Sequence, residues 1–204
     1  AAATQRLLAH IESKGYNNHI FGYFLAGMDT EEWYHWSCCS GQLAGYSTHT
    51  RKAFQVWLKN KYADNATLKA AWNMPDVTFD SAVVPGREER LDSGSGTFRD
   101  TASKMNVIDF YLFYNDIIPQ TIDYFAQVVK RATGNKKVVG AFYGYMYEFK
   151  GDPEFGHNAL ELYNKSKNLD FIFVTASYGN RQFATGGDYS RSPAYSVRLH
   201  GKLW

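Results

Sequence analysis

The chain has 204 residues, enough to bury one sizeable core, and its formal net charge is only +2. A charge this small creates no field that would attract nucleic acid or an anionic membrane, so we expect neither as a partner. No apolar run approaches the ~20 residues that a membrane span requires.

The first elements end in a long loop. The chain begins at Ala1 without an initiator Met or a signal peptide, which indicates a processed chain or a piece of a longer one. Gln5–Lys14 reads as the end of an amphipathic helix that closes at Gly15. The apolar run His19–Ala26 predicts a buried strand, and residues 28–50 predict a loop rich in Gly, Ser and Cys.

The middle of the chain is predicted to be helical around one irregular stretch. Thr50 is expected to cap a helix that runs through Tyr62, and Ala66–Trp72 predicts a shorter helix. Residues 76–105 read as a long irregular loop, which is commonly functional. Apolar residues at three- and four-residue spacing predict a helix over Val107–Thr133, which Pro119 should kink or split in two.

Strands and helices alternate in the last third. Lys137–Met146 and Leu169–Ala176 predict buried strands with a helix over His157–Ser166 between them, and Val197–Trp204 predicts a fourth strand. This alternation is typical of a parallel sheet in an α/β protein. An eight-unit barrel needs ~250 residues, so about four strands predict one partial (β/α)₈ barrel domain over residues 1–204. A complete doubly wound sheet is the alternative, but no Gly-x-Gly-x-x-Gly follows any predicted strand.

The most informative residues follow the first strand. Glu31 and Glu32 lie in the loop after it, five and six residues past Ala26, beside Trp33, Tyr34 and Trp36. Rings around a carboxyl group at a strand end would favour its protonated form, as a general acid requires, and would offer flat faces to a sugar. The alternative is that both glutamates simply begin a helix, where carboxylates complement the dipole.

Other aromatic residues lie near or just past the ends of the later predicted strands. Tyr143 and Tyr145 alternate with smaller residues, so they either line a sugar site or fill the core, and the same two readings apply to Tyr178 and Trp204. Cys38 and Cys39 are adjacent and cannot supply the spaced ligands of a metal site, so we expect no metal and no cofactor. They also leave the redox compartment open.

Seven segments together resemble glycoside hydrolase family 42 and its β-galactosidase-like relatives, a branch of the retaining glycosidases built on (β/α)₈ barrels. Each is weak alone, and the match rests on their order and spacing. The segments are 30–33, 51–62, 98–100, 107–111, 139–145, 169–171 and 196–204.

The resemblance implies roles for the residues. It makes Glu32 the general acid/base after the fourth barrel strand, with strands four to seven present and the nucleophilic glutamate beyond Trp204. It implies that Trp204 stacks under a sugar ring of a β-galactoside-like substrate. From their positions at the strand ends, Trp33, Tyr143, Tyr145 and Tyr178 are the other candidates for substrate contacts. Family members often carry a cysteine-rich zinc site, which two adjacent cysteines cannot reproduce.

We therefore expect a retaining β-glycosidase whose partners are a carbohydrate substrate and either the rest of the barrel or further copies of the chain. Two alternatives stay open. One is a carbohydrate-binding barrel without turnover. The other is a different barrel enzyme, for which Lys202, on the last predicted strand, is the candidate Schiff-base lysine.

Overall fold

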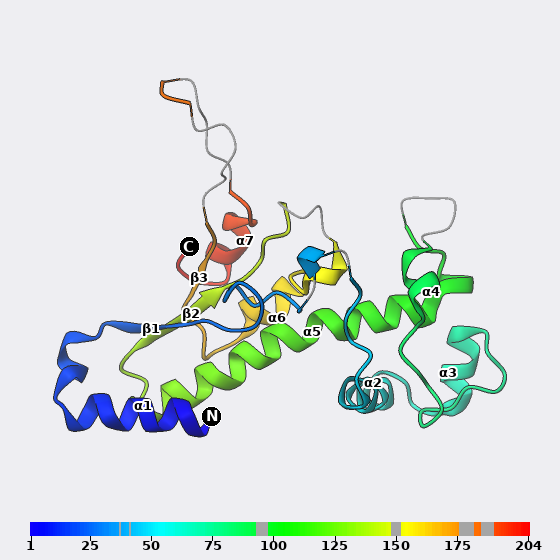
Figure 1. Ribbon diagram of the computed structural model, residues 1–204, viewed down its shortest axis with the longest axis horizontal. Coiled ribbons are helices and arrows are strands. Elements are labelled where there is room, and N and C mark those ends of the chain that lie inside the picture. Colours follow the sequence, from blue (N-terminus) through cyan, green and yellow to red (C-terminus); the bar gives the residue numbers. More distant parts are fainter. Residues whose placement is uncertain (37, 41, 93–97, 148–151, 176–181, 185–189) are drawn as a thin grey trace. The chain divides into compact units, whose positions relative to one another are not determined.

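The computed structural model describes residues 1–36, 38–40, 42–92, 98–147, 152–175, 182–184 and 190–204. The chain divides into two compact units. Unit 1 consists of Ala1–Trp36 and Asn115–Trp204, and unit 2 consists of Ser37–Tyr114. The strands belong to unit 1, and the described elements of unit 2 are helical (Figure 1).

Unit 1 is built on a parallel sheet that has three strands within the described residues. The strands are β1 (Gly22–Leu25), β2 (Val138–Phe142) and β3 (Phe171–Phe173), in that order across the sheet. Gly22 lies opposite Val138 and Gly140 opposite Phe171, so the carboxyl ends of the strands meet at one edge. Helices separate successive strands along the chain, which confirms the expected α/β class.

All three strands are shorter than the sequence predicted. His19 belongs to the 3-10 helix η1 (Tyr16–His19), so β1 begins three residues later. Beyond β2 the chain turns at Gly144, whose φ of 84° is left-handed and ends the extended conformation. An added Cβ at Gly144 would meet Leu160 and Ile172 at 3.2 and 3.3 Å, so close packing also favours glycine there.

The prediction of a fourth strand over Val197–Trp204 is wrong for most of its length. Helix α7 (Ala194–Leu199) follows Pro193 and closes at Gly201, whose φ is 72°. Leu203 alone joins the sheet, where a parallel bridge pairs it with Phe171. A short apolar run fits a buried helical turn and a strand equally well, because periodicity cannot separate them over so few residues.

Helices cover one face of the sheet, and the core of unit 1 lies between them. Figure 1 shows α5 (Thr101–Ala132) and α6 (Leu160–Lys165) on the same side of the strands. Helix α1 (Ala2–Ser13) and α7 each add one residue to this core. The core residues are Leu8, Trp33, Ile118, Ile122, Ala126, Val129, Val139, Ala141, Tyr143, Leu160, Tyr163, Leu169, Ile172 and Val197.

Helix α5 continues through Pro119, so the kink predicted there is wrong. The helix departs from helical dihedrals at Lys104 instead, where φ is −128°. Proline removes one backbone hydrogen bond from a helix, and the complete burial of Ile118 and Ile122 on either side compensates for that loss. No helix in the described part of the chain combines the length and the apolar character that crossing a membrane requires.

The other face of the sheet carries phenylalanines that contact one another. The Phe24 ring meets the rings of Phe142 and Phe173 at centroid distances of 4.6 and 5.6 Å, and the Phe171 ring lies over Gly140. An added Cβ at Gly140 would approach that ring within 2.4 Å, so only glycine fits. Phe24 and Phe173 are 42% and 50% exposed, which leaves this face of unit 1 apolar and open.

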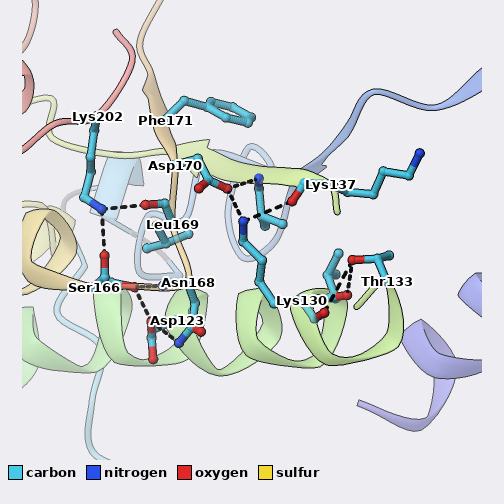
Figure 2. Close-up of polar contacts among 12 residues, drawn as sticks. Asp123, Lys130, Thr133, Lys137, Ser166, Asn168, Leu169, Asp170, Phe171 and Lys202 are labelled. Atoms are coloured by element: carbon cyan, nitrogen blue, oxygen red, sulfur yellow. Dashed lines mark hydrogen bonds and ion pairs between the residues drawn. The ribbon is translucent and has the colours of Figure 1, made fainter. Parts of the chain in front are cut away.

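Lysines tie together the amino ends of the strands (Figure 2). Lys137 Nζ donates to the carbonyls of Asn17 and Ile20, just before β1. Lys130 Nζ from α5 donates to Asp170, whose carboxylate also accepts the Val139 N–H at 2.8 Å.

Lys202 completes this network from the other side. Its ammonium donates to the carbonyls of Ser166 and Leu169, and burial lowers the pKa of Lys202. The side chain is therefore committed to backbone carbonyls at the amino ends of the strands, opposite the edge where barrel sites lie. This position removes the support for a Schiff-base role.

Unit 2 folds around a buried carboxylate. It contains 3-10 helix η2 (Cys38–Ser40), α2 (Thr48–Lys61), α3 (Asn65–Trp72), α4 (Arg87–Leu91) and the first part of α5. Asp109 is fully buried and accepts hydrogen bonds from Lys61 Nζ, Tyr62 OH and Trp72 Nε1 at 2.5, 2.7 and 2.7 Å. The charge is thus paired and its oxygens are satisfied, as burial of a carboxylate requires.

Two local predictions for unit 2 need correction. Ser47, not Thr50, caps α2, because the Ser47 hydroxyl accepts the Thr50 N–H at 3.0 Å. The stretch 76–105 is also not wholly irregular, since it contains α4 and the start of α5. Glu89 explains α4, because its carboxylate accepts the N–H of Gly86 at 2.7 Å and caps the first turn.

Candidate active site

The loop after β1 has an unusual backbone. Four of its non-glycine residues have left-handed φ values: Met28 (60°), Thr30 (52°), Glu31 (64°) and Trp33 (66°). Each such residue costs about 1–3 kcal/mol, and strain of this kind concentrates at functional sites. Backbone hydrogen bonds hold the loop, with Gly27 N–H donating to Glu31 and Trp33 N–H to Gly27.

Trp33 anchors this loop in the core. Its side chain is 4% exposed, and its indole N–H donates to the Leu25 carbonyl at 2.9 Å. An added Cβ on Gly27 would meet the indole ring at 3.0 Å, so the glycine lets the ring fold under the loop. Trp33 therefore offers no free face to a sugar, and the structure gives it a supporting place instead of the predicted substrate contact.

Glu32 lies on this loop at the carboxyl edge of the sheet. Its side chain is partly buried, and Oε1 accepts a hydrogen bond from Tyr145 OH at 2.6 Å. Oε2 accepts only a longer one from Thr30 Oγ1, at 3.3 Å, among the described residues. Its neighbour Glu31 is exposed. The two adjacent glutamates are therefore structurally distinct, and Glu32 is the one held by a buried partner.

Tyr145 is fully buried and follows β2. Burial first, and the hydrogen bond to Glu32 second, raise the pKa of Tyr145 well above its ordinary value, so the phenol stays protonated and acts as the donor. The phenol oxygen also accepts the Thr175 N–H at 3.4 Å, just past β3. Arg191, which is also buried, donates to Thr175 Oγ1 at 2.8 Å. The segments that follow β1, β2 and β3 thus meet at the Tyr145 hydroxyl.

The other predicted aromatic contacts separate into different places. Tyr143 fills the core, where its hydroxyl donates to the Gly156 carbonyl and accepts the Ala159 N–H, both at 3.2 Å. Gly144 breaks the alternation that would have put Tyr143 and Tyr145 on one face. Trp204 is 54% exposed on the apolar sheet face, and its indole N–H donates a hydrogen bond to Ser192 Oγ. Tyr178 lies outside the described residues.

His157 is a site residue that sequence reasoning missed. Its side chain is 2% exposed, and Nδ1 accepts the N–H groups of Gly144 and Tyr145 at 3.1 and 3.4 Å. Burial lowers the pKa of His157 to about 3, and the backbone carbonyls of Trp33 and Glu32 offset only part of that effect. The imidazole is therefore neutral at any ordinary working pH.

No sequence pattern marks His157, because its partners are backbone groups 12 and 13 residues away. Thr175 and Arg191 also contribute through contacts that no local pattern marks, although a position at the carboxyl end of a predicted strand is a signal for Thr175. Within the described residues, no three His, Cys, Asp or Glu side chains come together to hold a metal ion.

The partly buried carboxylate of Glu32 lies at the carboxyl edge of a parallel sheet, which is where barrel enzymes place their active sites. The model of glycoside hydrolase family 42, the β-galactosidases, matches residues 32–200, and the chain belongs to this family. The family implies a (β/α)₈ barrel, to which the parallel sheet of unit 1 corresponds. No curated protein matches the chain.

Proposed function

We propose that the chain forms the central part of a retaining β-glycosidase that removes terminal β-galactoside-like sugars, with Glu32 as general acid/base. The observation that carries the proposal is the 2.6 Å hydrogen bond from buried Tyr145 to Glu32 Oε1 at the carboxyl edge of the sheet. The family match supports glycoside hydrolysis as the reaction class.

The two oxygens of Glu32 have different environments, which suits an acid/base. Tyr145 occupies Oε1, whereas Oε2 has only the longer contact from Thr30. In the first step, Oε2 would give its proton to the glycosidic oxygen as the bond to the anomeric carbon breaks. In the second, the carboxylate would take a proton from the water that hydrolyses the glycosyl-enzyme.

Retention requires a second carboxyl group about 5–5.5 Å from the first, to attack the anomeric carbon. We propose that β1, β2 and β3 are the fourth, fifth and sixth barrel strands, that Leu203 begins the seventh, and that the nucleophilic glutamate lies beyond Trp204. The parallel bridge between Leu203 and Phe171 supports this order.

The open phenylalanine face supports the same assignment. An exposed apolar face of this kind would be buried by the remaining barrel strands, which we propose as its partner. Trp204 and Tyr178 remain our proposed sugar contacts. Trp33, Tyr143 and Tyr145 are buried, so we do not propose that a sugar stacks on any of these three rings. Residues 1–204 by themselves should hydrolyse no glycoside.

The test compares Glu32→Gln with Glu31→Gln in the full-length natural protein, on one galactoside with a poor leaving group and one activated aryl galactoside. We expect Glu32→Gln to lower kcat about a hundredfold or more on the poor leaving group and much less on the activated one, because only the first needs a proton. Glu31→Gln is the matched control and should change neither.

An equal loss on both substrates would contradict an acid role for Glu32. The same leaving-group pattern in Glu31→Gln would move the role to the neighbouring residue. Sugar binding without hydrolysis of either substrate by the unsubstituted protein would favour the alternative of a carbohydrate-binding barrel.

A further inference from the structure

A short segment bridges the loops that follow β1 and β2. Residues 153–159, which we call the strap, contain 3-10 helix η3 (Pro153–Phe155) and lead into α6. On one side, the His35 N–H donates to the Phe155 carbonyl at 3.4 Å. On the other, His157 Nδ1 accepts from Gly144 and Tyr145. The strap therefore contacts the backbone of the segment that carries Glu32, at His35, and the backbone of Tyr145 itself.

The strap is itself held at several points. Asn115, in the part of α5 that belongs to unit 1, donates to the Pro153 carbonyl and accepts the Asn158 N–H, both at 3.0 Å. The Tyr143 hydroxyl bonds Gly156 and Ala159. An added Cβ at Gly156 would meet Ile118 and the His35 ring at 2.8 Å, so the strap packs closely against its surroundings. His157 is thus carried by a segment with little freedom to shift.

Aromatic rings fix the orientation of the imidazole. Its ring stacks on Tyr143 at 4.7 Å, and the Tyr34 ring lies at the same distance with a tilt of 41°. Because both partners of Nδ1 are N–H donors, Nδ1 is the unprotonated nitrogen and the proton lies on Nε2. A neutral acceptor in one orientation therefore faces the two amides that begin the Tyr145 segment.

We infer that His157 is a positioning residue for the general acid/base: through the amides of Gly144 and Tyr145 it holds the Tyr145 hydroxyl on Glu32 Oε1 and so keeps Oε2 directed at the substrate. The inference rests on the proposed role of Glu32. His157 does not touch the carboxylate, and its effect passes through Tyr145.

An acceptor at the Nδ1 position is the property that matters. Asparagine can place its side-chain oxygen near that position, whereas glutamine places its amide closer to the position of Nε2. The pair His157→Asn and His157→Gln therefore separates loss of the acceptor from simple loss of the imidazole ring. Thermal unfolding of each variant shows whether it is folded at the assay temperature.

The experiment measures kcat and KM for both variants of the full-length natural protein on the poor and the activated galactoside. We expect His157→Gln to lower kcat on the poor leaving group by about tenfold to a hundredfold, with little change in KM. The loss on the activated substrate should be much smaller. In His157→Asn, most of the kcat on the poor leaving group should be retained. Equal losses for both variants on both substrates would overturn the inference and leave His157 a packing residue.

Combination with Glu32→Gln separates this inference from the proposed function. If Glu32→Gln shows the leaving-group pattern and His157→Gln adds nothing further in that background, the two residues act on one step. If Glu32→Gln shows the pattern but His157→Gln alone does not, only the positioning role fails. If Glu32→Gln lacks the pattern, the proposed function fails and the positioning role fails with it.

A further variant tests the positioning role of the strap without changing the His157 imidazole. Asn115→Ala removes the hydrogen bonds that hold the strap at Pro153 and Asn158. It should reproduce the leaving-group pattern of His157→Gln more weakly. Unchanged kinetics in folded Asn115→Ala would overturn the view that the strap sets the position of Tyr145.

Discussion

The two ends of the same three strands are built from different chemistry. At the amino ends, the ammonium groups of Lys130 and Lys202 donate to backbone carbonyls and to Asp170 (Figure 2). The Lys137 ammonium donates to the carbonyls of Asn17 and Ile20. At the carboxyl ends, a phenol and a neutral imidazole hold the loops, and one of those loops keeps a strained backbone.

The difference separates stability from chemistry. The lysines at the amino ends are engaged with carbonyls and a carboxylate, and the Lys202 contacts turn that side chain away from the site edge. At the carboxyl ends, the strained loop presents a carboxylate with one oxygen engaged and the other only lightly so. We therefore expect changes at the amino ends to affect unfolding and changes at the carboxyl ends to affect turnover.

Lowering the pH should reduce the free energy of unfolding first through His157, which lies at the carboxyl ends of the strands. The pKa of His157 is about 3 in the folded state against an ordinary 6.5, so the unfolded state binds more protons between these values. The contribution of His157 to stability is complete above pH 6.5 and is lost as the pH falls toward 3. Between pH 6.5 and 5, before most carboxylates titrate, we expect a loss of about 2 kcal/mol in urea unfolding.

The matched control for this pH effect is His157→Asn, which cannot titrate. Its free energy of unfolding should change less over pH 6.5 to 5 than that of the unsubstituted protein. Parallel pH profiles for the two proteins would show that His157 does not carry the acid sensitivity.

At the amino ends, Asp170→Ala should be comparably destabilising without altering turnover by the folded enzyme. It leaves the Lys130 ammonium, whose side chain is 10% exposed, without its carboxylate, and it removes the acceptor of the Val139 N–H. We expect a loss of about 2 kcal/mol in the free energy of unfolding, reduced from the fully buried case because Asp170 is 33% exposed.

Lys165→Met provides the comparison for Asp170→Ala. It breaks the exposed Glu161–Lys165 pair on α6 and should cost less than about 0.5 kcal/mol. A fall in kcat for folded Asp170→Ala, with normal stability, would contradict the view that the amino ends of the strands serve stability and the carboxyl ends serve turnover.

Tyr145→Phe should lower turnover without unfolding the protein, which is the reverse of what we expect for Asp170→Ala. The free-energy change should also be smaller. It removes only the hydroxyl that donates to Glu32 Oε1. We expect kcat on the poor leaving group to fall about tenfold, which corresponds to roughly 1.4 kcal/mol, because the carboxylate is no longer held. Steady-state kinetics on the two galactosides check this, and an unchanged ratio between the substrates would show that Tyr145 has no part in proton transfer.

The sequence predicted the parts of the fold that depend on local pattern. The amphipathic helices and the first three strands follow from apolar periodicity, and their existence was correct although their ends were not. The errors at Pro119 and over Val197–Trp204 have one cause. In both places packing against the rest of unit 1 decides the backbone, and a local pattern contains no information about that packing.

The candidate site was predictable only in part. Glu32 follows one predicted strand and Tyr145 lies near the carboxyl end of the next. Parallel strands bring their carboxyl ends to one edge, so the meeting of these two residues could be anticipated. Trp33 and Tyr143 could not be separated from sugar contacts, because an aromatic ring near a strand end looks the same whether it faces the core or a cleft. His157 acts on backbone amides, which every sequence contains.

The most direct test of Glu32 as the acid/base uses Glu32→Ala in the full-length natural protein with an activated aryl β-galactoside and sodium azide. Without Glu32, water attacks the glycosyl-enzyme slowly because nothing removes its proton, whereas azide needs no base. We predict that azide raises turnover and that the product is the β-galactosyl azide. Unchanged turnover in azide, with water still the only acceptor, would contradict the assignment of Glu32.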